Sequence, residues 1–284
     1  MNKNIQTFIG CDNEYDESKI AIFGAPFDST TSFRPGTRFA SKAMRSESFG
    51  IETYSTYQDK DLEDAAIFDC GDLELCFGNT EKALGQIEEL TDKIVKDNKI
   101  PCMIGGEHLV TLGAFRAVFK KYPDVHIIHF DAHADLRDDY LGEKLSHATV
   151  MHRVWDKVGD NKIFQFGIRS GDRNEIYWAK DHVFTNKFDF TGLKEVVEKL
   201  KGKPVYFTID LDVLDPSVFP GTGTPEAGGV DFKQLLEAIL EVSKLNIVGM
   251  DLNELSPIYD QSGSSTALAC KVLRELLLSV YKDD

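Results

Sequence analysis

The chain of 284 residues has few cysteines, an excess of acidic over basic residues and no long apolar run, and each of these features excludes a class of protein. The five cysteines are scattered and form no Cys-x-x-Cys pair, which argues against a disulfide framework and against structural zinc. Lys and Arg number 32 against 47 Asp and Glu, giving a formal net charge of -15, so nucleic acid or an anionic membrane is not the expected partner. No segment approaches the roughly 18 apolar residues of a membrane span.

The first residues also lack the apolar stretch of a signal peptide. Together with the unpaired cysteines, this favours a reduced, cytoplasmic protein. The composition is 42% hydrophobic and 28% charged, which is typical of a globular chain with a sizeable core. No linker, low-complexity segment or internal repeat interrupts the sequence, so we expect residues 1–284 to form one domain.

Short apolar segments alternate with amphipathic segments along the chain. The pattern predicts strands at residues 19–23, 65–68, 99–104, 125–130, 163–168, 182–185, 204–211 and 247–252. It predicts helices at residues 41–48, 81–98, about 108–121, 148–158, 173–180, 193–200, 231–242 and 265–281. This alternation favours a parallel sheet with helices on both faces, although eight strands also permit a closed barrel. In either fold a functional site is expected at the carboxyl ends of the strands.

Polar side chains that suit a cation follow four of the expected strands. After the strand at 125–130 they occupy alternate positions, so an extended backbone would place them on one face. Before residue 108, a glycine pair is expected to let the chain turn sharply. Each group alone has an ordinary structural explanation, but four of them on one edge of a sheet point to a shared site. The set is His108, Asp131, His133, Asp135, Asp210, Asp212 and Glu254.

The two histidines and four aspartates of this set are too many ligands for one ion if carboxylates bridge. They fit a two-metal site, in which the ions lie roughly 3.5–4 Å apart. Imidazole and carboxylate ligands suit a divalent ion such as Mn²⁺. Such a pair of ions lowers the pKa of a bridging water toward neutrality, which indicates hydrolytic chemistry.

The ordered motifs of the chain resemble those of the arginase/agmatinase ureohydrolase family. They are Gly105-Gly106-Glu107-His108, Asp131-Ala132-His133-Ala134-Asp135, Ser146-His147-Ala148-Thr149 and the run from Asp210 to Pro216. Residues 24–38 and 251–257 resemble the agmatinase branch, and the matches extend from about residue 22 to 268. The resemblance implies a three-layer α/β/α fold with a mostly parallel eight-stranded sheet, a single ureohydrolase domain and two Mn²⁺ per chain.

The resemblance also implies roles for single residues. One ion would be held by His108, Asp131, Asp135 and Asp210, and the other by His133, Asp131, Asp210 and Asp212. His147 matches the proton-shuttling histidine of the family, and Glu254 matches the carboxylate that grips the guanidinium group. Asp135 would pass a proton to the leaving amine. The other histidines, His126, His129, His152 and His182, match no motif, and we expect them to be structural.

The segment at residues 136–146 bears on the choice of substrate. In the arginase branch this segment supplies Asn and Ser groups that bind an α-carboxylate, and that pattern is absent here. An acidic loop with Asp138 and Tyr140 as substrate contacts suits a decarboxylated cation. We therefore expect hydrolysis of agmatine to putrescine and urea, a step of polyamine biosynthesis.

Other substrates with the same metal chemistry stay open. Guanidinobutyrate, guanidinopropionate, arginine or formiminoglutamate would each place a carboxylate near the site, where Arg34, Arg137 or Arg173 would receive it. The resemblance further implies a homo-oligomer, either a trimer or a hexamer.

Two other classes of function have less support. A metal-binding homologue without catalysis is expected to lack a ligand, His147 or Glu254, and all of these are present. A nucleotide-binding protein is suggested by the glycine-rich stretch at residues 221–229. That stretch contains Pro225 and has neither Gly-x-Gly-x-x-Gly spacing nor a Gly-x₄-Gly-Lys-Ser/Thr loop, so we interpret it as a loop that shapes a pocket.

Overall fold

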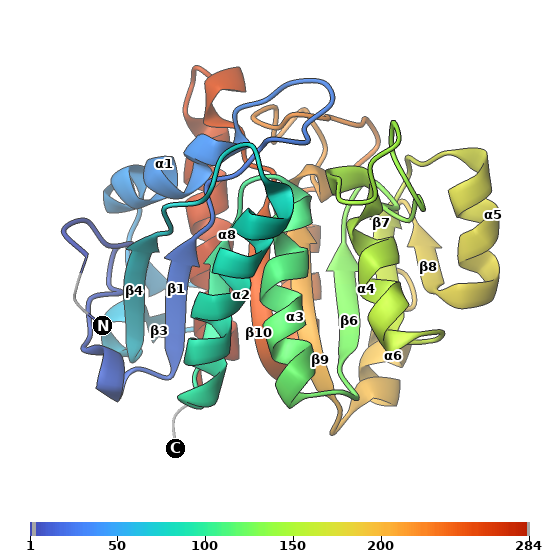
Figure 1. The fold of residues 1–284 in the computed structure, drawn as a ribbon. Coiled ribbons are helices and arrows are strands. Elements are labelled where there is room, and N and C mark those ends of the chain that lie inside the picture. Colours follow the sequence, from blue (N-terminus) through green and yellow to red (C-terminus); the bar gives the residue numbers. More distant parts are fainter. Residues whose placement is uncertain (2–3, 283–284) are drawn as a thin grey trace.

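The computed structural model describes residues 1 and 4–282. At the centre of the fold these residues form one open sheet of eight strands (Figure 1). The strands of this sheet are β1 (Ile20–Gly24), β4 (Ile67–Asp72), β5 (Ile100–Ile104), β6 (His126–Phe130), β7 (Ile163–Ile168), β8 (Phe184–Lys187), β9 (Pro204–Asp210) and β10 (Asn246–Asn253). Their order across the sheet is β4-β1-β5-β10-β9-β6-β7-β8, and neighbouring strands pair in parallel. The strands β4 and β8 are the two edges, so the parallel sheet is confirmed and the alternative of a closed barrel is wrong.

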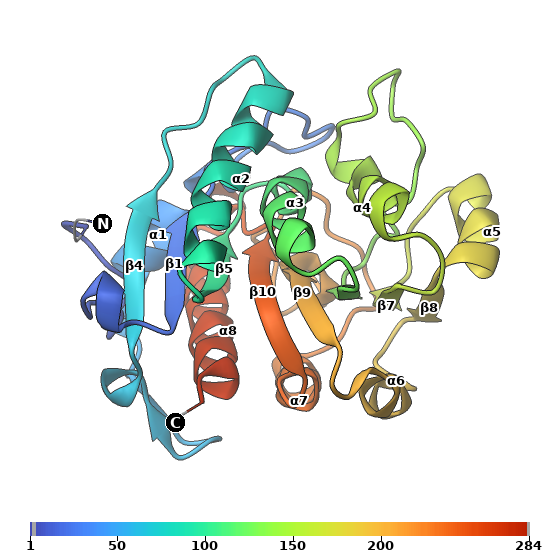
Figure 2. The ribbon, with the colours of Figure 1, turned by 60° about the horizontal axis from the view of Figure 1, so that its bottom comes forward.

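Helices cover both faces of the sheet, which gives the expected three layers (Figure 2). One face carries α2 (Thr80–Lys96), α3 (Thr111–Lys121) and α4 (Val150–Val158), with α5 (Arg173–His182) packed beside α4. The other face carries α1 (Ala40–Glu47), α6 (Leu193–Leu200), α7 (Phe232–Val242) and α8 (Ser264–Val280). Among the described residues, no helix is both long enough and apolar enough to cross a membrane.

The central strands are apolar because both of their faces are buried. All five residues of β6 are buried, and alternate side chains go to opposite layers. Ile128 and Phe130 join the core beneath α7 and α8, whereas Ile127 joins the core beneath α3. A strand covered on both sides therefore reads as a continuous apolar run, which is why these strands were predictable from sequence.

The boundaries differ from the expected ones where local signals are weak. The helix α5 continues to His182, because the Val183 N–H still donates to the Ala179 carbonyl at 2.9 Å, so β8 begins at Phe184 and not at residue 182. The helix α3 begins at Thr111, after a 3₁₀ turn over His108–Val110. A small hairpin of β2 (Tyr54–Ser55) and β3 (Lys60–Asp61) was not predicted, since two-residue strands give no hydrophobic period.

The glycine pair before His108 serves a different purpose from the one expected. Neither Gly105 nor Gly106 has a positive φ, so the chain does not need a left-handed turn there. A Cβ on Gly106 would lie 1.9 Å from the Phe27 carbonyl oxygen, and one on Gly105 would lie 1.8 Å from Asn253 Oδ1. These glycines therefore allow the loop after β1 and the end of β10 to approach the end of β5 closely.

The sheet order brings four carboxyl ends together at its centre. The strands β5, β10, β9 and β6 are neighbours in the sheet, although they are far apart in sequence. The residues that follow them, around positions 105–108, 131–135, 210–212 and 254, therefore meet at one place. This is the topological position where open α/β sheets bind ligands.

Candidate metal centre

His108 lies at the centre of the first group of side chains. Its ring is buried, and Nδ1 is 3.1 Å from Asp131 Oδ2, 3.1 Å from Asp135 Oδ2 and 3.5 Å from Asp210 Oδ2. Within the part of the chain that the structure describes, this nitrogen makes no hydrogen bond of acceptable geometry. A buried imidazole nitrogen that faces three carboxylates in this way fits a divalent cation among the four side chains.

The other ring nitrogen of His108, Nε2, belongs to a row of hydrogen bonds in which each donor and acceptor can be assigned. His108 Nε2 is 2.9 Å from Thr208 Oγ1, and the Thr208 hydroxyl donates its only hydrogen to Asp251 Oδ1 at 2.6 Å. The Thr208 oxygen must therefore accept from the Nε2–H of His108. Second contacts of this kind orient an imidazole toward a metal, and here they leave Nδ1 facing the carboxylates.

His133 lies at the centre of the second group. Its Nδ1 is 3.0 Å from Asp212 Oδ2 and 3.5 Å from Asp131 Oδ1. Backbone amides fix the carboxylates of Asp212 and Asp210. Ala132 N donates to Asp212 Oδ1 at 3.1 Å, and Asp212 N donates to Asp210 Oδ1 at 2.8 Å. The structure thus brings Asp131, Asp135 and Asp210 to His108, and Asp131 and Asp212 to His133. The two full sets of ligands and their roles stay a prediction.

The cluster has a surplus of negative charge. Burial, together with the charges of Asp212 and Asp131, raises the pKa of Asp210 well above its usual value. Burial, followed by the charges of Asp212 and Glu107, does the same to the pKa of Glu254. Bound cations would offset this repulsion, which is a second reason why the donor set fits divalent metal ions.

Two residues of the cluster have strained backbones. Asp135 has a φ of 54° and Glu254 a φ of 65°, in the left-handed region that non-glycine residues rarely occupy. Surrounding hydrogen bonds hold both, since the Asp135 carbonyl accepts from Met151 N at 3.0 Å and Glu254 N donates to the Gly106 carbonyl at 3.0 Å. Strain of this kind is often kept at functional sites, where it aims a side chain.

Glu254 stands beside the first group of ligands. Its Oε1 accepts from the backbone N–H of His108 at 2.7 Å, and the side chain lines the cavity above the cluster. A Cβ on Gly223 would lie 3.9 Å from Glu254 Oε2 and 2.9 Å from the Arg34 carbonyl oxygen. The glycine-rich loop therefore runs past Glu254 without a side chain, which agrees with its interpretation as a loop that shapes the pocket.

His147 lies across the cavity and is held by the loop after β1. The Thr30 hydroxyl donates to Glu107 Oε1 at 2.6 Å and accepts from the backbone N–H of His147 at 3.0 Å. Glu107 also accepts from Thr30 N at 2.9 Å and from the Thr31 hydroxyl at 3.2 Å. Burial raises the pKa of Glu107 to about 7 against these lowering hydrogen bonds, and burial lowers the pKa of His147.

The cavity over the cluster measures about 170 Å³, which suits a small ligand. Besides the cluster, its lining includes Ser32, Arg137, Tyr140, Ser170, Thr224 and Glu175. Tyr140 is therefore at the cavity, as expected, whereas Asp138 is exposed and pairs with Arg153 at 2.8 Å. The acidic residues of the 136–146 loop are not among the lining residues of this cavity.

The arginines near the site are already paired with other groups. Arg137 stacks on Tyr140 at 4.7 Å from the ring centroid, and its Nε is 3.9 Å from Glu175 Oε1. Arg34 stacks on Tyr259 at 3.9 Å. Of the three arginines named from the sequence, Arg137 is the one among the lining residues of the cavity.

Glu175 is a site residue that sequence reasoning missed. It is buried, and its Oε2 accepts from Leu136 N at 3.3 Å, next to Asp135. Burial raises the pKa of Glu175 to about 7. The available signal was the Asp172-x-x-Glu175 pattern that begins α5, since a capping box placed just after a strand brings its Glu to the same edge of the sheet.

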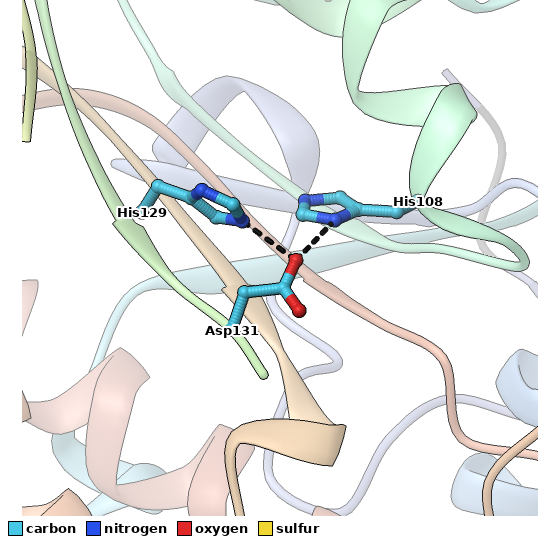
Figure 3. A group of neighbouring side chains, drawn as sticks. All are labelled: His108, His129 and Asp131. Atoms are coloured by element: carbon cyan, nitrogen blue, oxygen red, sulfur yellow. Dashed lines mark hydrogen bonds and ion pairs between the residues drawn. The ribbon is translucent and has the colours of Figure 1, made fainter. Parts of the chain in front are cut away.

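A third histidine, His129, also contacts the cluster, through Asp131. It is fully buried, and its Nε2 is 2.7 Å from the same Asp131 oxygen that faces His108 (Figure 3). His108, His129 and Asp131 are thus close enough to hold an ion together, as are Asp131, His133 and Asp212. His129 matches no motif, so the sequence alone predicts a structural role for it.

Known proteins resemble the chain over nearly its whole length. The sequence profile of the group described as Arginase family matches residues 18–279. An agmatinase of Bacillus cereus is 48% identical over 98% of this chain and 97% of its own length, and an agmatinase of Halalkalibacterium halodurans is 50% identical over 96% of each chain. The crystal structure of a putative agmatinase from Clostridium difficile superimposes with a TM-score of 0.92 at 55% identity, covering 94% of this chain and 99% of that one.

Proposed function

The chain belongs to the arginase family, and from this membership we propose that it is an enzyme that hydrolyses agmatine to putrescine and urea. The single observation that carries the proposal is the meeting of two histidine–carboxylate groups with Glu254 at the floor of one small cavity. The family membership indicates hydrolysis of a guanidino group. The two histidine–carboxylate groups and Glu254 are the kinds of side chain that this reaction needs.

Two divalent ions are part of this proposal, and Mn²⁺ is the one that the ligands favour. His108 and Asp135 would serve one ion, His133 and Asp212 the other, and Asp131 and Asp210 both, as expected from the sequence. When bound, the ions supply a hydroxide nucleophile at neutral pH, because they lower the pKa of water.

The side chains around the ions would orient the substrate and move its protons. The guanidinium group is planar with parallel N–H donors, so the Glu254 carboxylate would hold it by paired charge-assisted hydrogen bonds. The reaction that these residues would serve replaces the bond from the central carbon to the nitrogen of the butylamine chain with a bond to an oxygen that comes from water. Asp135 would carry the proton to the leaving nitrogen, and His147, on the lining of the cavity, would exchange protons with solvent.

A buried carboxylate on the lining of the cavity supports a cationic substrate. Agmatine carries an ammonium group at the end opposite its guanidinium, and Glu175 provides a carboxylate on the lining of the cavity. A nearby cation would favour the ionised form of Glu175. The α-carboxylate of arginine would instead lie near Glu175, so like charges oppose it.

A second candidate, a guanidino-acid hydrolase, is favoured by one observation. Arg137 lies on the cavity lining and would pair with the carboxylate of guanidinobutyrate if it left its place on Tyr140. Its contacts with Asp172 and Glu175, at 3.7 and 3.9 Å, oppose this movement. We therefore place agmatine first.

The test is a comparison of substrates on the Mn²⁺-loaded chain. We expect the highest kcat/KM for agmatine among agmatine, arginine, guanidinobutyrate, guanidinopropionate and formiminoglutamate. An equal or higher kcat/KM for arginine would contradict the proposal. A preference for guanidinobutyrate that disappears in Arg137→Ala would establish the second candidate.

The setting of the enzyme is also part of the proposal. We propose a cytoplasmic homo-oligomer built from one domain per chain. The free cysteines Cys11, Cys70, Cys76, Cys102 and Cys270 support a reducing compartment. The exposed Phe77 and Leu141, at 93% and 86% exposure, support an interface between chains. Light scattering on the purified protein measures the oligomer size, and a monomer would contradict this part.

A further inference from the structure

The contacts of His129 raise the question of whether it is a third histidine ligand. Its Nε2 and the Nδ1 of His108 both reach Asp131 Oδ2, at 2.7 and 3.1 Å (Figure 3). A ligand must present a lone pair at Nε2, whereas a hydrogen-bond donor must carry a hydrogen there. The other nitrogen of the ring decides between these states, because a neutral imidazole has one of each.

Gln165 on β7 determines the state of that other nitrogen. Gln165 Nε2 is 3.0 Å from His129 Nδ1 and 2.7 Å from the carbonyl oxygen of Ala134. The amide cannot be turned around, because its oxygen would then lie 2.7 Å from another carbonyl oxygen with no hydrogen between them. The amide oxygen of Gln165 supports the same orientation, because Gln165 Oε1 accepts from the Thr185 hydroxyl on β8 at 3.1 Å.

The order of donors then follows along the chain of contacts. The two hydrogens of the Gln165 amide go to Ala134 O and to His129 Nδ1, so Nδ1 is an acceptor. The single ring hydrogen is therefore on Nε2, where it is donated to Asp131 Oδ2. With that hydrogen in place, His129 has no lone pair to offer a metal ion.

We propose that His129 is not a ligand but a positioning residue, which Gln165 locks in its Nε2–H form so that it fixes the carboxylate of Asp131 between the two metal sites. The inference rests on the metal roles in the proposed function. Both His129 and Gln165 are fully buried, so no water competes for these hydrogen bonds.

The position of Asp131 explains why such a lock has an effect. Asp131 Oδ2 faces His108, and Asp131 Oδ1 faces the His133 ring while accepting from His133 N at 2.6 Å. A rotation of this carboxylate would disturb both groups of ligands together. One donor on each oxygen, His129 Nε2 on Oδ2 and His133 N on Oδ1, prevents that rotation. Second contacts of this type commonly change metal affinity by 10–100-fold.

The experiment measures Mn²⁺ affinity by competition with a chelator, on the full chain and without reference to turnover. His129→Leu should raise the Mn²⁺ Kd by about tenfold to a hundredfold. His129→Gln places an amide N–H near the original Nε2, and we expect it to recover a Kd within about threefold of the unchanged chain. A Kd for His129→Leu within this threefold range, or a Kd for His129→Gln as weak as that for His129→Leu, would overturn the proposal.

Two control variants separate the lock from general packing. His126→Leu makes the same change at the other end of β6 and should leave the Kd unchanged. Thr185→Val removes the outer hydroxyl and should also leave it unchanged, because Ala134 O already fixes the Gln165 amide. A large loss of affinity in either control would show that any change in this layer weakens the site, and would overturn the proposed lock.

A second route covers the case in which His129→Leu does not fold. Gln165→Leu keeps His129 and removes the lock, so the Kd should rise and the ¹⁵N signals of the His129 ring should no longer show one Nε2–H form. Unchanged affinity and an unchanged ring form in Gln165→Leu would overturn the proposal. Failure of the proposed function looks different, since the unchanged chain itself would then fail to bind about two Mn²⁺ or to hydrolyse agmatine.

Discussion

At the scale of single residues, Asp131 and Asp210 differ from the other proposed ligands because each belongs to both sets. We expect Asp131→Ala or Asp210→Ala to release both ions, whereas Asp212→Ala should keep about one ion per chain. Elemental analysis of the Mn²⁺-loaded variants measures this. Two ions retained in Asp131→Ala, or none in Asp212→Ala, would contradict the assignment.

Glu254 offers a test of substrate orientation that leaves the metals in place. Glu254→Gln keeps an oxygen that accepts from His108 N, so both ions should stay bound. The loss of a charge-assisted contact to the guanidinium costs about 1.5–3 kcal/mol, so kcat/KM should fall about tenfold to a hundredfold. A variant with full Mn²⁺ content and normal kcat/KM would mean that another group orients the substrate.

The residues found from sequence and the residues missed differ in how far their contacts reach. Asp131, His133 and Asp135 could be named together from sequence because they lie within five positions after one strand, although the left-handed backbone of Asp135 departs from the extended geometry that was expected. Glu107 could not be connected with His147, because Thr30 joins them across 77 and 117 positions of sequence. Side-chain partners at such separations leave no periodic signal, so only the folded arrangement reveals them.

At the scale of elements, the loop between β1 and α1 holds His147 through one hydroxyl. Thr30→Val removes the contacts of this hydroxyl with Glu107 and with His147 N, and each such bond contributes about 0.5–1.5 kcal/mol. We expect kcat to fall severalfold while Mn²⁺ content stays unchanged.

The neighbouring threonine supplies the matched control. Thr31 touches Glu107 but has no contact with His147 among the hydrogen bonds of the loop, so Thr31→Val should reduce kcat less. Equal losses of kcat in the two variants would mean that the loop acts only through Glu107 and does not position His147.

The first turn of α8 predicts a dependence of stability on pH. Asp260 Oδ2 accepts from Ser265 N at 2.7 Å and from its hydroxyl at 2.6 Å. Burial would raise the pKa of Asp260, but the hydrogen bonds from Ser262 and Ser265 outweigh it and lower the pKa to about 2. The carboxylate therefore stabilises the fold above its unfolded pKa of about 3.9, and this stabilisation is lost as the pH falls toward 2.

Comparison with Asp260→Asn isolates this contribution. Urea unfolding should show a loss of about 1 kcal/mol in the variant at pH 7, and the difference should shrink as the pH falls below about 4. A difference that stays constant down to pH 3 would show that the charge of Asp260 is not responsible.

Most elements could be predicted because their pattern is local, and the exceptions have local causes too. The helix α6 was expected at residues 193–200 and is found over Leu193–Leu200, since its apolar side chains repeat at helical spacing. The position of β8 was predicted two residues too early. This strand lies at an edge of the sheet, and its partly exposed residues give no continuous apolar run. The order of the strands, in contrast, is a property of contacts between distant segments, and periodicity carries no information about it.

At the scale of the whole molecule, the proposed single domain and the proposed metals make one prediction about unfolding. Each ion held at a hundredfold excess over its Kd stabilises the fold by about 2.7 kcal/mol, so removal of Mn²⁺ should lower Tm by several degrees. The loaded chain should unfold in one transition, because the ligands come from strands across the sheet. Two separate calorimetric transitions, or a Tm unaffected by chelation, would contradict this.

The order of the strands has a further consequence for the birth of the protein. The strands β9 and β10 are the last to be synthesised, yet they lie between β5 and β6, which are made much earlier. During synthesis, His108 and Asp131 therefore leave the ribosome before the strands β9 and β10, which lie between β5 and β6 in the sheet. The long-range pairings that insert the last strands close slowly compared with local helices. Loading of the proposed metal centre would thus be a late event, which follows the synthesis of β9 and β10. A chain cut short before residue 204 would lack the proposed ligands Asp210 and Asp212, the proposed substrate contact Glu254 and the two strands that join the halves of the sheet.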